Sequence, residues 1–130
     1  MSRLARGAQP NPASNIISGV VANNATWYED IELTQNGAQL TGVSDHVWEM
    51  EFYLEPGSGA ELTLSTADST LTITETTSTT LGIRVGPAAL SAMCGDYWCD
   101  LKSTDASPTV DGESRVYLWG RGIVTFVEGA

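Results

Sequence analysis

The chain contains three segments in which apolar and polar residues alternate: Leu81-Gly-Ile-Arg-Val85, Gly95-Asp-Tyr-Trp-Cys-Asp-Leu101 and Tyr117-Leu-Trp-Gly-Arg-Gly-Ile-Val-Thr-Phe-Val127. Alternation with a period of two is typical of half-buried strands in an antiparallel sheet. Between the first two segments, Pro87 begins a short Ala/Leu/Met stretch, which predicts one helical turn ending before Gly95. The segments contain no catalytic motif, so this part of the chain predicts a scaffold or a docking module.

More strands are predicted on the N-terminal side of this stretch. The clearest covers residues 46–54, where Trp48, Met50 and Phe52 share an apolar face. Shorter patterns around it are separated by turn signals such as Asn36-Gly37. About seven or eight short strands with almost no helix predict an all-β fold: an antiparallel β-sandwich, immunoglobulin-like or jelly-roll-like. An open barrel is the second choice.

Length and charge restrict the class of protein. A chain of 130 residues makes one ordinary domain. Six Lys and Arg against 16 Asp and Glu give a net charge of −10. Arg3 and Arg6 lie in the first 22 residues, which contain no acid, so residues 23–130 hold 4 basic and 16 acidic groups, a net of −12. Such a body repels phosphate backbones, and nucleic-acid binding is not expected. Its acidity supports solubility or attracts a basic partner.

Residues 1–22 are predicted to form an extended N-terminal arm, followed by the sandwich domain at 23–130. Pro10 and Pro12 interrupt regular structure. The alternatives are a frayed tail and an arm that orders against a neighbouring subunit.

The apolar residues of the arm come in two pairs, Ile16-Ile17 and Val20-Val21, separated by Ser18-Gly19. An apolar segment broken in this way predicts neither a signal peptide nor a membrane span. We therefore expect synthesis in a cytoplasm and no membrane partner.

The sequence offers little for acid–base catalysis. His46 is the only histidine and lies on a predicted apolar face, so we expect a role in the core or at its edge. Ser44, Asp45 and His46 are adjacent, but neighbouring strand residues diverge and do not form a triad. Glu49 and Glu51 share a strand face and are the candidates for a glycosidase pair, although a solvated face is the favoured interpretation.

Metal and disulfide sites are also weakly supported, and we expect no metal and no cofactor. Cys94 and Cys99 are five residues apart, which favours free, partly buried thiols. A disulfide would need a bend between them, and one histidine makes a poor zinc set. The acidic residues in this region lack the spacing of an EF-hand loop, so calcium bound by a loop is only a minor alternative. These residues are Asp96, Asp100, Asp105, Asp111 and Glu113.

Aromatic residues give the clearest candidates for a binding surface. Trp98 alternates with Tyr97 and is predicted to face outward, as is one of Tyr117 and Trp119. Exposed aromatic side chains on a sandwich can stack against sugars or anchor a protein interface. The alternative for these residues is that they pack in the domain's own core. Together with the apolar residues of the arm, the candidate partner-binding residues are Ile16, Ile17, Val20, Val21, Trp98 and Trp119.

Between residues 26 and 127 the signals follow one order. They are Trp27 ahead of Gln39-Leu-Thr-Gly42, Trp48-Glu-Met-Glu-Phe-Tyr53, Leu71-Thr-Ile73, Leu81-Gly-Ile-Arg-Val85, a small-residue turn before Gly95-Asp-Tyr-Trp-Cys-Asp-Leu101, and Gly120-Arg-Gly-Ile-Val-Thr-Phe126. This ordered set resembles the small immunoglobulin-like β-sandwich modules of tailed-phage virions, of which the N-terminal domains of phage baseplate upper proteins are examples.

The resemblance implies a non-enzymatic structural protein of a tailed bacteriophage particle. It would be made in the host cytoplasm and located in the virion, where its arm and a sheet face dock onto other virion proteins, either capsid or tail subunits. Capsid decoration or cement, neck, tail and baseplate positions all fit, and a symmetric homo-oligomer is expected. Because no fibre domain follows the module, we expect an adaptor or decoration protein and not a receptor-binding one. No catalytic residue carries over from the family.

Two other functions remain open. One is a carbohydrate-binding β-sandwich module that uses Trp98 or Trp119 for stacking. The other is a small hydrolase, which the lack of catalytic motifs disfavours.

Overall fold

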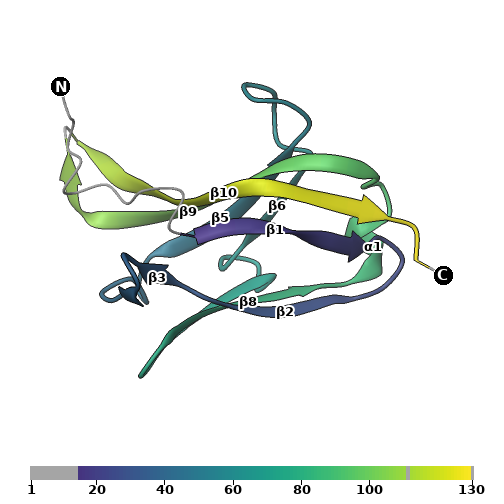
Figure 1. Ribbon diagram of the computed structural model, residues 1–130. Helices are drawn as coiled ribbons and strands as arrows, with labels where there is room; N and C mark the ends of the chain where they lie inside the picture. The colour runs from purple at the N-terminus through teal and green to yellow at the C-terminus, as the bar shows by residue number, and fades with distance from the viewer. Residues whose placement is uncertain (1–14, 111, 130) are drawn as a thin grey trace.

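Two β-sheets face each other across a shared core in the computed structural model of the chain (Figure 1). The structure describes residues 15–110 and 112–129, without the side chains of residues 15–18 and 106–110. The larger sheet has five strands in the order β1 (Asn15–Ala22), β10 (Glu113–Val127), β9 (Gly95–Val110), β5 (Val47–Tyr53) and β6 (Leu62–Ser65). The smaller sheet has the order β2 (Trp27–Glu32), β8 (Thr79–Val85) and β7 (Leu71–Glu75).

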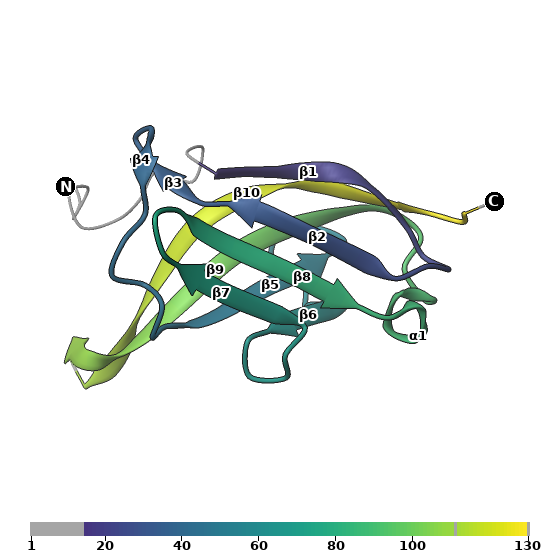
Figure 2. The same cartoon turned by 90° about the horizontal axis from the view of Figure 1, so that it is seen from below.

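The remaining elements are short. A two-stranded hairpin of β3 (Thr34–Gln35) and β4 (Ala38–Gln39) turns at Asn36 and Gly37, which both have positive φ, as an Asn-Gly hairpin turn requires. The helical turn α1 (Pro87–Leu90) begins at the predicted proline. Figure 2 shows β2, β8 and β7 crossing in front of β10, β9 and β5. The prediction of an all-β sandwich with mainly antiparallel pairing is confirmed.

The core forms where the inward faces of the two sheets meet. Trp48, Met50 and Phe52 of β5 are fully buried, as the alternation predicts. Trp27 of β2 packs edge-to-face against Phe52 at 5.9 Å and against Phe126 at 6.1 Å between ring centroids, and so joins the two sheets. Burying each such ring contributes roughly 1.5–3 kcal/mol, and aromatic edge contacts add about 0.5–1.5 kcal/mol.

The second half of the predicted arm is a strand of the domain. β1 pairs in parallel with β10, from Asn15 opposite Gly120 to Ala22 opposite Val127. Val21 is only 8% exposed and belongs to the core. The predicted boundary at residue 22 therefore needs correction for residues 15–22, because their pairing partner lies about a hundred residues away in sequence, where no local pattern reveals it. Residues 1–14 lie outside the described residues.

The β9–β10 hairpin is much longer than the sequence pattern predicts. The alternating segments end at Leu101 and begin again at Tyr117, but β9 runs to Val110 and β10 begins at Glu113. The hairpin extends past the end of the sandwich, beyond the positions where β5 and β1 pair with it (Figures 1 and 2). β10 contains a bulge between Leu118 and Gly120, where its register against β9 shifts.

Candidate functional site

Exposed apolar side chains gather on the surface of the five-stranded sheet that points away from the core, which we call the outer face. Seven large apolar residues are exposed among those whose side chains are described. Side chains alternate between the two faces of a strand, so a residue next to a core residue lies on the outer face, as does its direct partner on the neighbouring strand. By this criterion five of the seven lie on the outer face: Val20, Val47, Val116, Ile123 and Val127. Val20, at 71% exposed, is the most open of the seven.

Cross-strand register arranges the outer face in rows. In one row Trp98 of β9 lies between Tyr53 of β5 and Ile123 of β10. The row beside it is charged and consists of Glu51, Asp100 and Arg121. Directly opposite side chains in a sheet are close enough to interact, so each row acts as a unit of surface.

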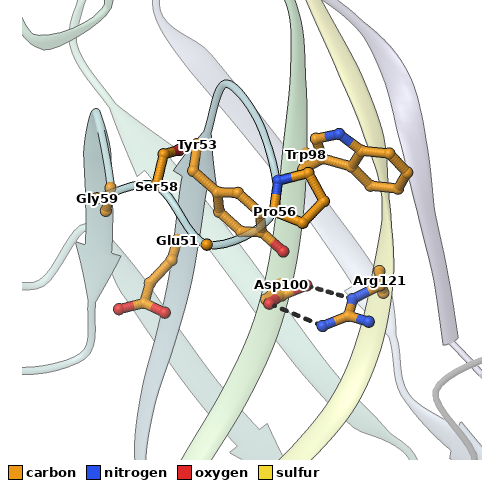
Figure 3. A pocket seen from close by; sticks show the side chains of 10 residues that line it. Glu51, Tyr53, Pro56, Ser58, Gly59, Trp98, Asp100 and Arg121 are labelled. Atoms are coloured by element: carbon orange, nitrogen blue, oxygen red, sulfur yellow. Dashed lines mark hydrogen bonds and ion pairs between the residues drawn. The ribbon is translucent and has the colours of Figure 1, made fainter.

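A hollow of about 540 Å³ opens on the outer face at the end of β5. Figure 3 shows Tyr53, Trp98, Asp100 and Arg121 around it. The loop that follows β5 closes its other side with Pro56 and the small residues Gly57, Ser58, Gly59 and Ala60. This loop is held by a turn in which the Ser58 hydroxyl donates to the Glu55 carbonyl at 2.7 Å. The volume falls in the range of roughly 300–1,000 Å³ that is common for small-ligand sites.

The charges beside the hollow are paired. Arg121 donates from Nε and Nη2 to the two carboxylate oxygens of Asp100 at 2.8 and 3.3 Å. Lys102 Nζ lies 2.5 Å from Glu51 Oε1. The hydrogen bond to Asp100 and its charge raise the pKa of Arg121. Two ion pairs give fixed donors and acceptors at the rim of the hollow, and the Arg–carboxylate fork is the more rigid of the two.

Tyr53 keeps its proton at neutral pH. Burial, followed by the hydrogen bond to Asp100, raises the pKa of Tyr53 to about 12. The hydroxyl is therefore a neutral donor and acceptor on the wall of the hollow.

The structure places the two tryptophan candidates on opposite sides of the sheet. Trp98 is half-buried on the outer face, as the alternation predicts. Trp119 is 6% exposed and belongs to the core, where it donates from Nε1 to Ser103 Oγ at 2.7 Å and stacks on Trp48 at 6.1 Å. The prediction of an exposed Trp119 is wrong because the bulge at Leu118/Gly120 reverses which side chains of β10 point inward.

The four apolar candidates of the arm also separate. Val20 lies on the outer face, whereas Val21 points into the core. Ile16 and Ile17 belong to β1, opposite Arg121 and Gly122, and their side chains lie outside the described residues. Only Val20 is thus placed as an accessible contact residue.

His46 belongs to a buried network that the sequence did not reveal. Its Nδ1 lies 2.9 Å from Ser103 Oγ and its Nε2 lies 3.6 Å from Asp105 Oδ2, while its ring stacks on Tyr117 at 5.9 Å. Ser103 is fully buried, so no substrate reaches its hydroxyl. The contacts support the core role expected for His46, and the adjacent Ser44 and Asp45 are exposed and take no part.

The other candidate chemistry is modest. Cys94 is exposed, Cys99 is buried, and both are free thiols. Burial raises the pKa of Cys99 and keeps it protonated. Glu51 is committed to Lys102, so Glu49 and Glu51 do not stand as a free carboxylate pair. In the described part of the chain, no group of three or more His, Cys, Asp or Glu side chains is placed to hold a metal ion.

Comparison of the chain with models of protein families and with curated proteins gives no match. Within residues 15–110 and 112–129, no helix has the length and apolar character needed to cross a bilayer.

Proposed function

We propose that this protein is a non-enzymatic docking module of a tailed-phage particle, and that the outer face contacts a neighbouring virion subunit. The observation that carries the proposal is the concentration of exposed apolar side chains on that one face. Monomeric proteins rarely leave such side chains gathered together, and a gathered set is typical of a protein–protein contact.

The position of the apolar residues favours an extended contact. Val20 and Ile123 lie near β1, at one edge of the sheet, while Val47 and Val116 lie on either side of Thr104, where the β9–β10 hairpin leaves the body. A partner that covers both regions would follow β10 along its length. Specific interfaces bury about 800 Å² per partner, which a surface of this kind provides more readily than one small patch does.

The charges on the outer face are already paired, Arg121 with Asp100 and Lys102 with Glu51. A partner that contacts the apolar residues beside them therefore meets no isolated ion. Breaking such pairs on burial is costly, whereas burying them intact costs less. The assignment to a virion rests on the resemblance of the ordered sequence signals, and the sheet face supplies the contact surface.

The test is incorporation of the chain into particles that assemble with it. Ile123→Asp adds a charge to the apolar surface beside β1 and should reduce the copies per particle at least tenfold, measured by quantitative mass spectrometry against the major shell protein. Tyr28→Asp is the control, because Tyr28 is also an exposed large apolar residue but lies on the other sheet. Equal incorporation of both variants, or absence of the unaltered chain from particles, contradicts the proposal.

The same measurement gives the position. Copies on the order of hundreds indicate an icosahedral shell and a decoration or cement protein, while roughly a dozen or fewer indicate a neck or tail ring.

A further inference from the structure

We propose that the hollow bounded by Tyr53, Trp98, Asp100 and Arg121 binds a neutral pyranose saccharide. This site goes beyond docking through the outer face, and binding to the isolated chain does not require docking. The hollow lies over β5, β9 and β10 beside the loop 55–60, whereas Val20 lies on the edge strand β1.

The aromatic side chains supply the stacking surface. Tyr53 and Trp98 lie opposite each other on neighbouring strands, and both line the hollow. Pyranose rings carry C–H groups on one side, which pack against the negative face of an aromatic ring. Trp98 is on the outer face and not in the core, so its ring remains accessible where Trp119 and Trp48 do not.

The polar side chains supply directional hydrogen bonds at the same place. Asp100 and Arg121 form a rigid fork, and the guanidinium offers five N–H donors of which the fork uses two. Glu51 and the Tyr53 hydroxyl, whose proton is donated to Asp100, add acceptors on the same wall. A sugar hydroxyl both donates and accepts, so adjacent hydroxyls match a carboxylate beside a guanidinium. Small residues in the loop, from Gly57 to Ala60, leave room for the ring.

The position within the sheet favours a saccharide over a peptide. Extended peptides are commonly bound by pairing with an open sheet edge. The hollow instead lies over β5, β9 and β10, which are interior strands whose backbone groups already pair with neighbours on both sides. The ligand must therefore be recognised by side chains.

The charge of the surroundings favours a neutral sugar. Asp100 and Glu51 each have one basic partner, and the body carries a strong net negative charge. An acidic saccharide would be repelled at long range.

The experiment is titration calorimetry of the full chain with cellohexaose, maltohexaose and chitohexaose, using heparin and a decaproline peptide as comparison probes. We expect at least one hexaose to bind and heparin not to bind. Trp98→Ala should weaken binding about tenfold or more, and Tyr53→Phe, which keeps the ring and removes the hydroxyl, by about threefold. Tyr28→Ala removes an exposed ring from the other sheet and should leave the affinity unchanged.

Circular dichroism establishes that each variant is folded. If Trp98→Ala does not fold, the affinity of Tyr53→Phe still tests the proposal. The proposal is overturned if none of the three hexaoses binds, if binding survives both substitutions unchanged, or if decaproline binds in their place. Saccharide binding is measured on the isolated chain and incorporation on particles, so failure of one proposal is distinguishable from failure of the other.

Discussion

The outer surfaces of the two sheets differ in how their exposed large apolar side chains are covered. On the three-stranded sheet, Arg84 lies 3.6 Å from the centre of the Tyr28 ring and pairs with Asp30 at 2.9 Å, so the exposed ring is covered by the domain's own cation. On the five-stranded sheet the basic side chains pair with acids, and Val20 and Ile123 remain uncovered. The comparison shows that one surface covers a face of its exposed ring with its own side chains, whereas the apolar side chains of the other stay uncovered, as the proposed docking requires.

Gly82 shows how closely the three-stranded surface is filled. A Cβ added at this position would lie 2.5 Å from Thr72 Oγ1 and 3.3 Å from both Arg84 and Asp30. The glycine therefore allows these side chains to lie across the strand. Gly59 lines the hollow of the other sheet, and a Cβ added there would meet no atom within 4 Å.

The largest effect on stability is expected at Trp119, which the bulge turns from the outer face to the core. Trp119→Ala should lower the free energy of unfolding by about 3–5 kcal/mol, because it leaves a cavity and removes the buried hydrogen bond to Ser103. Trp98→Ala should cost less than about 1.5 kcal/mol, since Trp98 is half-buried. Urea unfolding of both variants measures the difference, and similar losses would show that the two tryptophans are not on opposite sides.

The second largest effect on stability is expected at Gly82, on the outer surface of the three-stranded sheet. Gly82→Ala should destabilise the protein by about 1–3 kcal/mol because Thr72 must move, and Thr72→Ala in the same chain should restore part of the loss. Gly59→Ala is the matched control and should lie within about ±0.5 kcal/mol of the unaltered chain. Thermal unfolding distinguishes these outcomes, and equal effects at the two glycines would remove the contrast between the surfaces.

A smaller effect on stability is expected at low pH, through Glu75 of the three-stranded sheet. The Glu75 carboxylate at the end of β7 accepts hydrogen bonds from the backbone N–H groups of Gly42 and Val43 at 2.9 and 3.1 Å, which lowers its pKa. A lowered pKa contributes stability that is present above the unfolded value, about 4.3, and is lost as pH falls through the folded value. Glu75→Gln should therefore flatten the decline in stability below about pH 4.5, measured by urea unfolding at several pH values; an unchanged decline would contradict it.

Asp68 provides an independent check of the same kind. Its carboxylate accepts hydrogen bonds from the Thr70 side chain and backbone, which lowers its pKa. The Asp68→Asn and Glu75→Gln effects should add, because the two carboxylates accept from different backbone segments.

The smallest effect on stability is expected on the outer face. Ile123→Ser should change the free energy of unfolding by less than about 0.5 kcal/mol, because the side chain is exposed. Arg84→Ala should cost more than this substitution, through loss of the cation–π contact and an exposed ion pair. If Ile123→Ser proves the more damaging of the two, the apolar surface stabilises the isolated domain and is not a surface left for a partner.

Much of the fold was predictable from local pattern. The alternation over residues 46–54 determined which side chains of β5 face the core, and the Asn36-Gly37 pair determined a tight hairpin. The same alternation put Trp98 on the outside. These features depend on side-chain period and on turn geometry, both of which are written in neighbouring residues.

The candidate site was only partly predictable. Trp98 was among the candidates, but the hollow also needs Tyr53, Asp100 and Arg121, which come from three strands and meet only through cross-strand register. The aromatic character of Tyr53 and the two-residue spacing of Asp100 from Trp98, which puts both on one face of a strand, were the available signals. Neither says which strands are neighbours.

By itself, the sequence determined an acidic all-β domain with alternating strands and little catalytic chemistry. Tertiary structure alone decided that residues 15–22 pair with the last strand, that a bulge turns Trp119 inward, and that His46 meets Ser103 and Asp105. The reason is physical: strand pairing and register are set by contacts between residues far apart in the chain, and a one-residue shift reverses every side chain beyond it.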